Sequence, residues 1–226
     1  MESQLYVLII GGTSGLGLAL HDTLSQKHAV MITGRKWPEG RTDLSFLSLN
    51  LTPRSRLGKE LTFIKPYFPY PIDLLIFAAG AEEDGNISQL PVSEIEDMIT
   101  LGLTAPIRIV KMILDRQDTL PGFIAITSTS QDIPRLREPV YTAVKAGLAM
   151  FANSLSLDPR VGKVLVAAPG GMKTRFWRKR PDVDQSGYLD ADWVAQETLK
   201  EFDKDFKYRC IKLFRGPARV EVQETR

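Results

Sequence analysis

Short apolar runs, continuous rather than alternating in polarity, divide the sequence at fairly regular intervals. Continuous apolar strands are typical of a parallel sheet covered by helices on both faces, because no side chain of such a strand points to water. The runs span residues 5–10, 29–33, 46–49, 72–78, 123–127, 163–168 and 210–214. The pattern therefore predicts an α/β fold: a single Rossmann-fold domain with a doubly wound parallel sheet of about seven strands and helices on both faces.

Segments with helical periodicity lie between most of these runs. We expect helices at about 15–27, 53–65, 91–115, 140–157 and 190–205. Pro106 should bend or break the third of them, because proline lacks the N–H that a helix interior requires. The crossover from Gly34 to Ser45 contains Trp-Pro-Glu-Gly at 37–40, which favours turns, so we expect a loop or a single turn there.

The length and composition fit one domain over residues 1–226. The 29 Lys and Arg residues nearly balance 27 Asp and Glu residues, so no overall basic field favours nucleic acid or anionic membranes. The start of the chain has no basic region, and its first apolar run is too short for a signal-peptide core or a membrane span. We expect a soluble, cytoplasmic protein without nucleic-acid or membrane partners.

Histidine and cysteine are scarce. The chain has one cysteine, Cys210, and two histidines, His21 and His28, both near its start. These numbers disfavour disulfides, a metal site and a Ser-His-Asp triad. We therefore predict no metal, and we expect Tyr, Lys or a carboxylate as the acid/base group of any enzyme activity.

A glycine-rich turn joins the first run to the first expected helix, with Gly11, Gly15 and Gly17 at its key positions. Glycines there allow a tight turn and close approach to a pyrophosphate, which the helix dipole and free amides attract. The position favours a dinucleotide site over a simple turn in a non-binding protein.

The end of the second run carries cations where NAD-selective sites usually carry a carboxylate. Arg35 and Lys36 stand there, and arginine can bind the extra phosphate of NADP in a bidentate manner. Thr13 and Ser14 could add hydroxyl donors. The alternative is a solvated loop; the residues favour NADP(H) over NAD(H).

Tyr141 and Lys145 are spaced i and i+4, hence on one helical face. A cation beside a phenol favours the phenolate and lowers the Tyr pKa, as general acid/base catalysis requires. An ordinary helix surface with an aromatic and a lysine is the alternative interpretation.

Five signals occur in the order typical of the short-chain dehydrogenase/reductase family, which the chain resembles from end to end. They are the glycine turn, the Phe-Ala-Ala-Gly at 77–80, Ser128 thirteen residues before Tyr141, the Tyr-x-x-x-Lys pair, and the segment 169–174. The resemblance implies that Tyr141 is the acid/base, that Lys145 lowers its pKa and holds the nicotinamide ribose, and that Ser128 binds the reacting oxygen. Ser130 is the near alternative to Ser128.

The resemblance also implies the cofactor contacts. Asn50 would accept a hydrogen bond from the adenine amino group, where the family usually has Asp. The implied set is Gly11, Thr13, Ser14, Gly15, Leu16, Gly17, Arg35, Asn50, Leu51, Ala78, Ala79, Gly80, Tyr141, Lys145, Pro169, Gly170, Met172 and Thr174.

The resemblance implies an NADP(H)-dependent oxidoreductase that transfers a hydride between nicotinamide and a carbonyl or alcohol. Gly102 stands where the family usually has an Asn that holds a relay water, which raises an alternative: an NADP(H)-binding regulatory or interaction protein with weak or no catalysis.

A substrate loop at about 129–140, a lid at about 172–189 and a homodimer or homotetramer are also implied. The basic and aromatic residues of these segments could suit an anionic or planar small-molecule substrate, or the cofactor phosphates. A solvated, mobile lid is the alternative interpretation.

Overall fold

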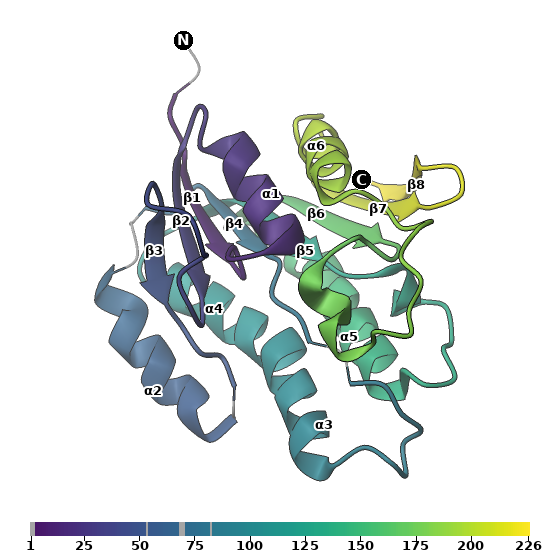
Figure 1. Cartoon of the computed structure of the whole chain (residues 1–226). Helices are drawn as coiled ribbons and strands as arrows, with labels where there is room; N and C mark the ends of the chain where they lie inside the picture. The colour runs from purple at the N-terminus through teal and green to yellow at the C-terminus, as the bar shows by residue number, and fades with distance from the viewer. Residues whose placement is uncertain (1–2, 53, 68–70, 82) are drawn as a thin grey trace.

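The computed structural model describes residues 3–52, 54–67, 71–81 and 83–226. Within them one sheet has eight strands in the order β3-β2-β1-β4-β5-β6-β7-β8 (Figure 1). All neighbours are parallel except β7 and β8. The strands are β1 (Tyr6–Ile10), β2 (Ala29–Gly34), β3 (Ser45–Ser48), β4 (Leu74–Phe77), β5 (Leu120–Ile126), β6 (Val161–Pro169), β7 (Tyr208–Phe214) and β8 (Arg219–Thr225). The predicted α/β class with a doubly wound sheet is confirmed.

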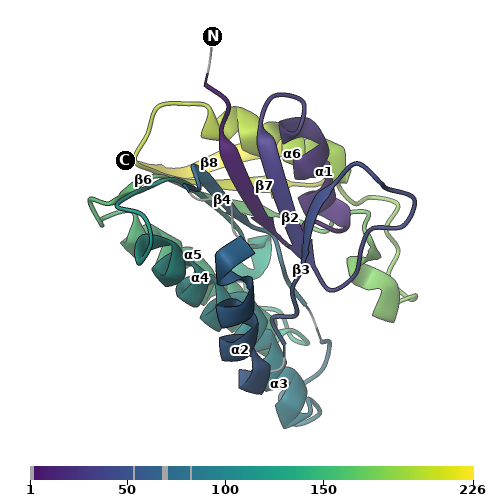
Figure 2. The same ribbon diagram turned by 90° about the vertical axis from the view of Figure 1, so that its left-hand side faces the viewer.

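Helices cover both faces of the sheet, as Figure 2 shows. Strand β1 illustrates the division, because Val7 and Ile9 pack on the α1 and α6 side while Leu8 and Ile10 pack on the other. Both side-chain sets are buried, which is why the strands are continuously apolar. The helices are α1 (Gly15–Leu24), α2 (Arg54–Ile64), α3 (Val92–Ile99), α4 (Ala105–Leu114), α5 (Pro139–Leu155) and α6 (Ala191–Phe202). In the described residues, no helix is both long enough and apolar enough to cross a membrane.

A widened π-helical turn at Thr100–Thr104 separates α3 from α4. It ends two residues before Pro106, whose nitrogen has no hydrogen to donate to the carbonyl of Gly102. The predicted interruption of the helix at 91–115 is confirmed, and it takes the form of this local widening.

The short crossover between β2 and β3 contains no helix, as predicted. Its loop is held by side chains: Trp37 Nε1 donates to the Arg41 carbonyl at 2.7 Å, and its ring packs on Phe46. Arg41 also pairs with Asp22 of α1 and with Asp43. These contacts replace the packing that a crossover helix would provide.

Strand β8 was not predicted, so the expectation of about seven strands was one short. Its residues are mostly exposed and mix charged with apolar side chains, which leaves no continuous apolar run to recognise. It returns antiparallel to β7 through residues 215–218, with Phe214 paired to Arg219. Gly216 adopts a positive φ of 68° in this turn, which glycine accommodates without strain.

Candidate active site

A cleft of about 650 Å³ opens at the carboxyl ends of the central strands. Strand β1 lies between β2 and β4, where the chain changes direction across the sheet, and ligands of doubly wound folds bind at this point. The cleft is lined by every residue that the sequence predicted for cofactor binding or catalysis. One end is formed by the turn after β1 and the other by α5 and the segment 172–189.

The glycine turn is built for close approach of backbone and ligand. Gly15 has a φ of 53° and begins α1, whose first residues line the cleft and whose first amides have no partner within the helix. A Cβ on Gly17 would lie 2.1 Å from the carbonyl oxygen of Gly11, so a side chain there would force the turn apart. The turn therefore offers a phosphate cradle, which fits a dinucleotide.

The adenosine end combines the turn after β1 with the ends of β2 and β3. Arg35 is exposed at the cleft, and the Thr13 side chain packs against Gly34 beside it. The Asn50 oxygen accepts hydrogen bonds from the backbone nitrogen and hydroxyl of Thr52, at 3.2 and 3.1 Å. These bonds hold the Asn50 oxygen within its own turn, and the contact of Asn50 with adenine stays a prediction.

Helix α5 brings Tyr141 and Lys145 to the other end of the cleft. The Lys145 nitrogen lies 5.6 Å from the centre of the Tyr141 ring and donates to the Ile126 carbonyl at 3.1 Å. Lys145 is only 5% exposed, and its burial lowers its pKa to about 8. A Cβ on Gly80 would stand 3.5 Å from this ammonium, so the ammonium is closely surrounded.

The two candidate serines differ in their hydrogen bonds. Ser128 begins the turn after β5, and its hydroxyl oxygen accepts the Ser130 backbone N–H at 3.1 Å. Its hydroxyl proton therefore stays available to a ligand. The Ser130 hydroxyl donates to Glu138 at 3.3 Å. The geometry thus favours Ser128 as the donor to a reacting oxygen.

Gly102 is packed directly against α5. A Cβ at this position would lie 2.3 Å from Cγ1 of Val144, the residue before Lys145. The space in which an amide side chain could stand beside the lysine is occupied by Val144. Any proton path to Lys145 on this side therefore lacks a side-chain amide at position 102.

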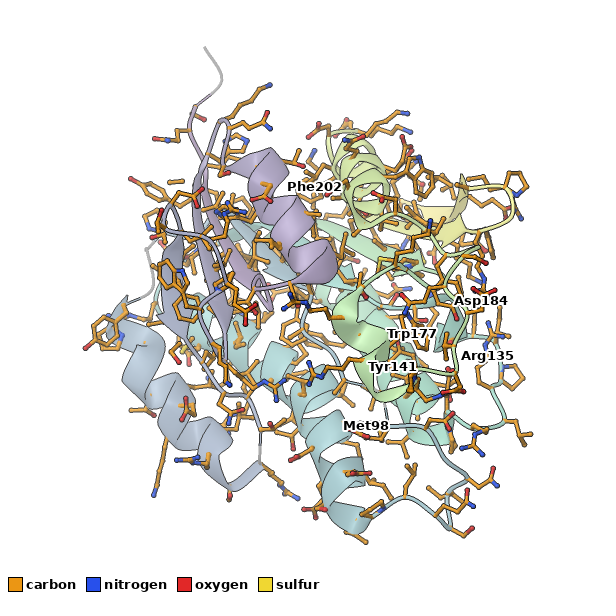
Figure 3. The ribbon with its side chains drawn as sticks, in the orientation of Figure 1. Met98, Arg135, Tyr141, Trp177, Asp184 and Phe202 are labelled. Atoms are coloured by element: carbon orange, nitrogen blue, oxygen red, sulfur yellow. The ribbon has the colours of Figure 1, made fainter. Side chains whose placement is uncertain are left out.

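The segment 172–189 folds back over the cleft. Its two ends are joined by backbone hydrogen bonds. The Lys173 N–H donates to the Leu189 carbonyl at 2.9 Å, and the Leu189 N–H donates to the Gly171 carbonyl, also at 2.9 Å. Figure 3 labels Trp177 in the 3₁₀ turn at Arg175–Lys179, and its indole donates to the Met172 carbonyl at 3.0 Å. A Cβ on Gly15 would contact Thr174 at 3.1 Å, so this segment reaches the phosphate cradle.

Aromatic rings form a continuous row along this segment. Phe176 lies 6.1 Å from Tyr141 and 5.4 Å from Trp177, which in turn lies 5.4 Å from Tyr188, measured between ring centres. Edge and tilted contacts of this kind are favourable between aromatic rings. The row gives this end of the cleft an apolar wall that begins at the Tyr141 ring.

Asp84 joins three loops that surround the cleft. It follows β4 and pairs with Arg137 of the loop after β5, with Arg137 Nε at 2.7 Å, and with Arg180 of the segment after β6 at 2.6 Å. The Asp84 side chain is 10% exposed, and its bond to Arg137 lowers its pKa. We call this group of three residues the Asp84 clamp.

Other lining residues were missed by the sequence analysis. Helix α3 contributes Met98, labelled in Figure 3, and the β7–β8 turn contributes Arg215. Neither belongs to a recognisable motif. The Gly-Pro pair at 216–217 was a usable signal for a turn after the last apolar run, and a hairpin there would have placed Arg215 near the cleft.

The family model of short chain dehydrogenases matches residues 5–184 of the chain. Among curated proteins, the 3-oxoacyl-[acyl-carrier-protein] reductase FabG of Salmonella typhimurium is 27% identical over 194 residues, which cover 80% of this chain and 79% of the relative.

Solved structures share the fold at lower identity. A short-chain dehydrogenase from Sphingobium yanoikuyae in complex with NADPH has a TM-score of 0.77 at 21% identity, covering 92% of this chain and 87% of that one. A short chain dehydrogenase/reductase family protein has a TM-score of 0.80 at 18% identity, covering 94% and 97%.

Proposed function

This chain belongs to the short-chain dehydrogenase/reductase family, and we propose that it transfers a hydride between NADP(H) and a carbonyl or alcohol substrate. The observation that carries the proposal is the shared cleft, in which a phosphate cradle at one end faces Tyr141, Lys145 and Ser128 at the other. The relative named as a 3-oxoacyl reductase supports reduction of a carbonyl group. The bound nicotinamide supplies the hydride, so the chain itself provides binding, orientation and the proton.

Each of the three side chains has a distinct task in this proposal. Tyr141 donates its phenolic proton to the substrate oxygen in reduction and takes it back in oxidation. Ser128 donates a hydrogen bond to the same oxygen and stabilises its developing charge. Lys145 favours the phenolate of Tyr141 through its charge and holds the nicotinamide ribose hydroxyls.

The preference for NADP(H) over NAD(H) rests on the end of β2. The residues after Thr33 are Gly34, Arg35 and Lys36, so the loop offers a guanidinium where a carboxylate would select the ribose 2′-hydroxyl. Thr13 packs beside this loop and can donate to a 2′-phosphate. The NADPH bound to the Sphingobium yanoikuyae dehydrogenase is compatible with this assignment.

A spectrophotometric assay tests the function. The purified chain is mixed with NADPH or NADH and a panel of aldehydes, ketones and 3-oxo esters, and cofactor oxidation is followed. We expect turnover with at least one carbonyl compound and a higher kcat/KM with NADPH. Turnover with NADH at equal efficiency would contradict the preference for NADP(H). An Arg35→Ala variant with unchanged preference would contradict the role of Arg35 in binding the 2′-phosphate.

A second candidate is an NADP(H)-binding regulatory or interaction protein with little catalysis. The contact of Val144 with Gly102 favours it, because it removes the usual position of a relay amide. The same panel separates the two candidates: NADPH binding at micromolar concentration without turnover of any carbonyl compound supports the second.

We also propose that residues 129–140 form the substrate loop, that residues 172–189 form a lid, and that the chain forms a homodimer or homotetramer through α4 and α5. Ile107 and Met150 on these helices are 39% and 63% exposed, and such apolar side chains suit an interface. Light scattering of the purified protein measures its mass in solution and tests the assembly.

A further inference from the structure

The arginines that line the cleft in the described residues are Arg35, Arg135, Arg175, Arg178 and Arg215. Arg175 lies 4.0 Å from Glu39, while Arg137 and Arg180 lie outside the lining and belong to the Asp84 clamp. Arg215 also lines the cleft but forms no ion pair with any carboxylate in the described part of the chain. Its guanidinium contacts the Tyr188 ring instead, 4.5 Å from the ring centre. An exposed cation of this kind keeps its donors available for a ligand.

Backbone and ring contacts place Arg215 on the β6 side of the cleft. The Leu213 carbonyl, two residues earlier, accepts the Gly170 N–H at 2.8 Å. The Tyr188 ring beneath the guanidinium packs on Gly171, where a Cβ would lie 2.6 Å from the ring. Arg215 therefore stands beside the turn after β6. The phosphate cradle lies after β1, and β4 and β5 separate β1 from β6 in the sheet.

The β7–β8 hairpin fixes this arginine in place. Phe214 and Arg219 are paired on the two strands, so residues 215–218 form a short, tied turn. The contact with the Tyr188 ring further restricts the guanidinium, because a cation over an aromatic ring is attracted to its face. A fixed guanidinium fork binds a carboxylate or phosphate at low entropic cost.

We propose that Arg215 binds an anionic group of the carbonyl substrate. This inference rests on the proposed function and names its substrate class: an oxo acid whose carbonyl meets Tyr141 and Ser128 and whose apolar body lies along Phe176 and Trp177. The row of rings runs from Tyr141 through Phe176 and Trp177 to Tyr188, whose ring contacts the guanidinium, and all of these residues line the same cleft.

Matched acids and esters test the proposal. The probes are 4-acetylbenzoate and 4-oxo-4-phenylbutanoate with their methyl esters, which keep the ketone and remove the charge. For the wild type we expect kcat/KM to be about tenfold higher for at least one acid than for its ester, as one charged hydrogen-bonded pair provides. Arg215→Gln should abolish this acid-to-ester ratio, and Arg215→Lys should restore part of it.

Arg219→Gln is the matched control. Arg219 lies on the same hairpin and its guanidinium also covers a ring, that of Phe214 at 4.7 Å, but it pairs with Glu221 and does not line the cleft. This variant should keep the wild-type ratio. An equal loss in both variants would overturn the proposal, because it would reflect damage to the hairpin.

Calorimetry of the same probes on the NADPH-loaded protein gives a readout that does not need turnover. Tighter binding of an acid than of its ester, lost in Arg215→Gln, supports the proposal even if no probe is reduced and the proposed function fails. Equal affinities of acid and ester in the wild type overturn it even if ketones are reduced. A larger effect of Arg215→Gln on NADPH affinity than on acid affinity would instead assign Arg215 to the cofactor phosphates and overturn it as well.

Discussion

At the glycine end of the cleft, the groups that face a ligand are mainly backbone atoms of one short turn between β1 and α1. At the opposite end, which we call the lid end after the proposed lid at 172–189, they are side chains that come from α5, the segment 172–189 and the β7–β8 hairpin. A substitution in the turn acts on the backbone path itself and therefore on every contact made there. A substitution at the lid end removes one chemical group and leaves its surroundings in place. The two ends should thus respond to mutation in different quantities, binding at the first and chemistry or selectivity at the second.

The largest expected effect belongs to the lid end. Tyr141→Phe removes the acid/base proton while the ring keeps its contact with Phe176. We expect kcat to fall by roughly 10²–10⁴-fold. The affinity for NADPH, measured by fluorescence titration, should stay within about twofold, because the phenyl ring preserves the packing.

Tyr6→Phe is the control, because Tyr6 is half-exposed at the start of β1 and does not line the cleft. It should keep wild-type kcat. Full activity of Tyr141→Phe would exclude Tyr141 as the acid/base group.

Gly17→Ala tests the glycine end of the cleft. The new Cβ would lie 2.1 Å from the Gly11 carbonyl oxygen, so the turn must open. Overpacking of this kind costs about 1–3 kcal/mol. If the whole cost reduces cofactor binding, the Kd for NADPH should rise by roughly 5–150-fold.

Gly187→Ala is its control, because a Cβ there meets nothing within 4 Å. Thermal unfolding shows how much of the cost falls on stability. An unchanged Kd and melting temperature in Gly17→Ala would show that the turn is not constrained as the structure indicates.

Lys145→Met tests whether the buried charge of Lys145 lowers the free energy of unfolding. Burial lowers the Lys145 pKa to about 8, from an ordinary value of 10.5. That difference corresponds to a burial cost of ~3 kcal/mol, reduced by ~1 kcal/mol for the lost bond to Ile126. We expect an inactive variant that is more stable than wild type by about 2 kcal/mol at pH 7 in urea unfolding.

The pH dependence of this gain has a definite sign. Below pH 8 Lys145 is charged in both the folded and the unfolded wild type, so the folded chain bears the full free-energy cost of burying the ammonium. Between pH 8 and 10.5 the folded chain releases its proton first, and the advantage of Lys145→Met should disappear. Lys200→Met, at an exposed position, is the control and should show no such pH dependence. A destabilised Lys145→Met at pH 7 would contradict the burial cost.

Asp84→Asn gives the smallest expected effect and tests the side-chain links of the lid end. It breaks the Asp84 clamp but leaves Tyr141, Lys145 and Ser128 untouched. We expect KM for the carbonyl substrate to rise by roughly 3–10-fold with kcat within twofold, as the loss of one or two charged hydrogen bonds allows.

The pH dependence of stability supplies a second readout for the clamp. Because the Asp84 pKa is lowered in the folded chain, its stabilising effect is present above the ordinary carboxyl pKa of 3.8 and is lost as the pH falls below it. Asp182→Asn, which removes a more exposed partner of Arg180, should have a smaller effect on KM. Equal KM values in both variants would show that the clamp does not position the loops.

The same contrast explains what could be predicted from the sequence. The seven parallel strands, the glycine turn and the Tyr141–Lys145 pair depend on local spacing and on burial of both sheet faces, which a sequence displays directly. The Asp84 clamp and the environment of Arg215 depend on side chains that are distant along the chain, and no periodicity encodes their meeting. Strand β8 was not predicted because its exposed residues mix charged and apolar side chains and so form no continuous apolar run. The hydrogen bonds from Thr52 to the Asn50 oxygen were not predicted, because an amide oxygen is equally suited to adenine.

Strand β8 also decides how the sheet ends. Without it, the backbone groups of β7 would be open to pairing with a strand of another molecule, and β7 is mostly buried and apolar. The outer strand instead presents ion pairs along its length, Arg219 with Glu221 and Glu224 with Arg226. Charged edge strands resist the edge-to-edge association that leads to aggregation. We therefore expect deletion of residues 217–226 to increase aggregation relative to the full chain, measured by light scattering at matched concentrations.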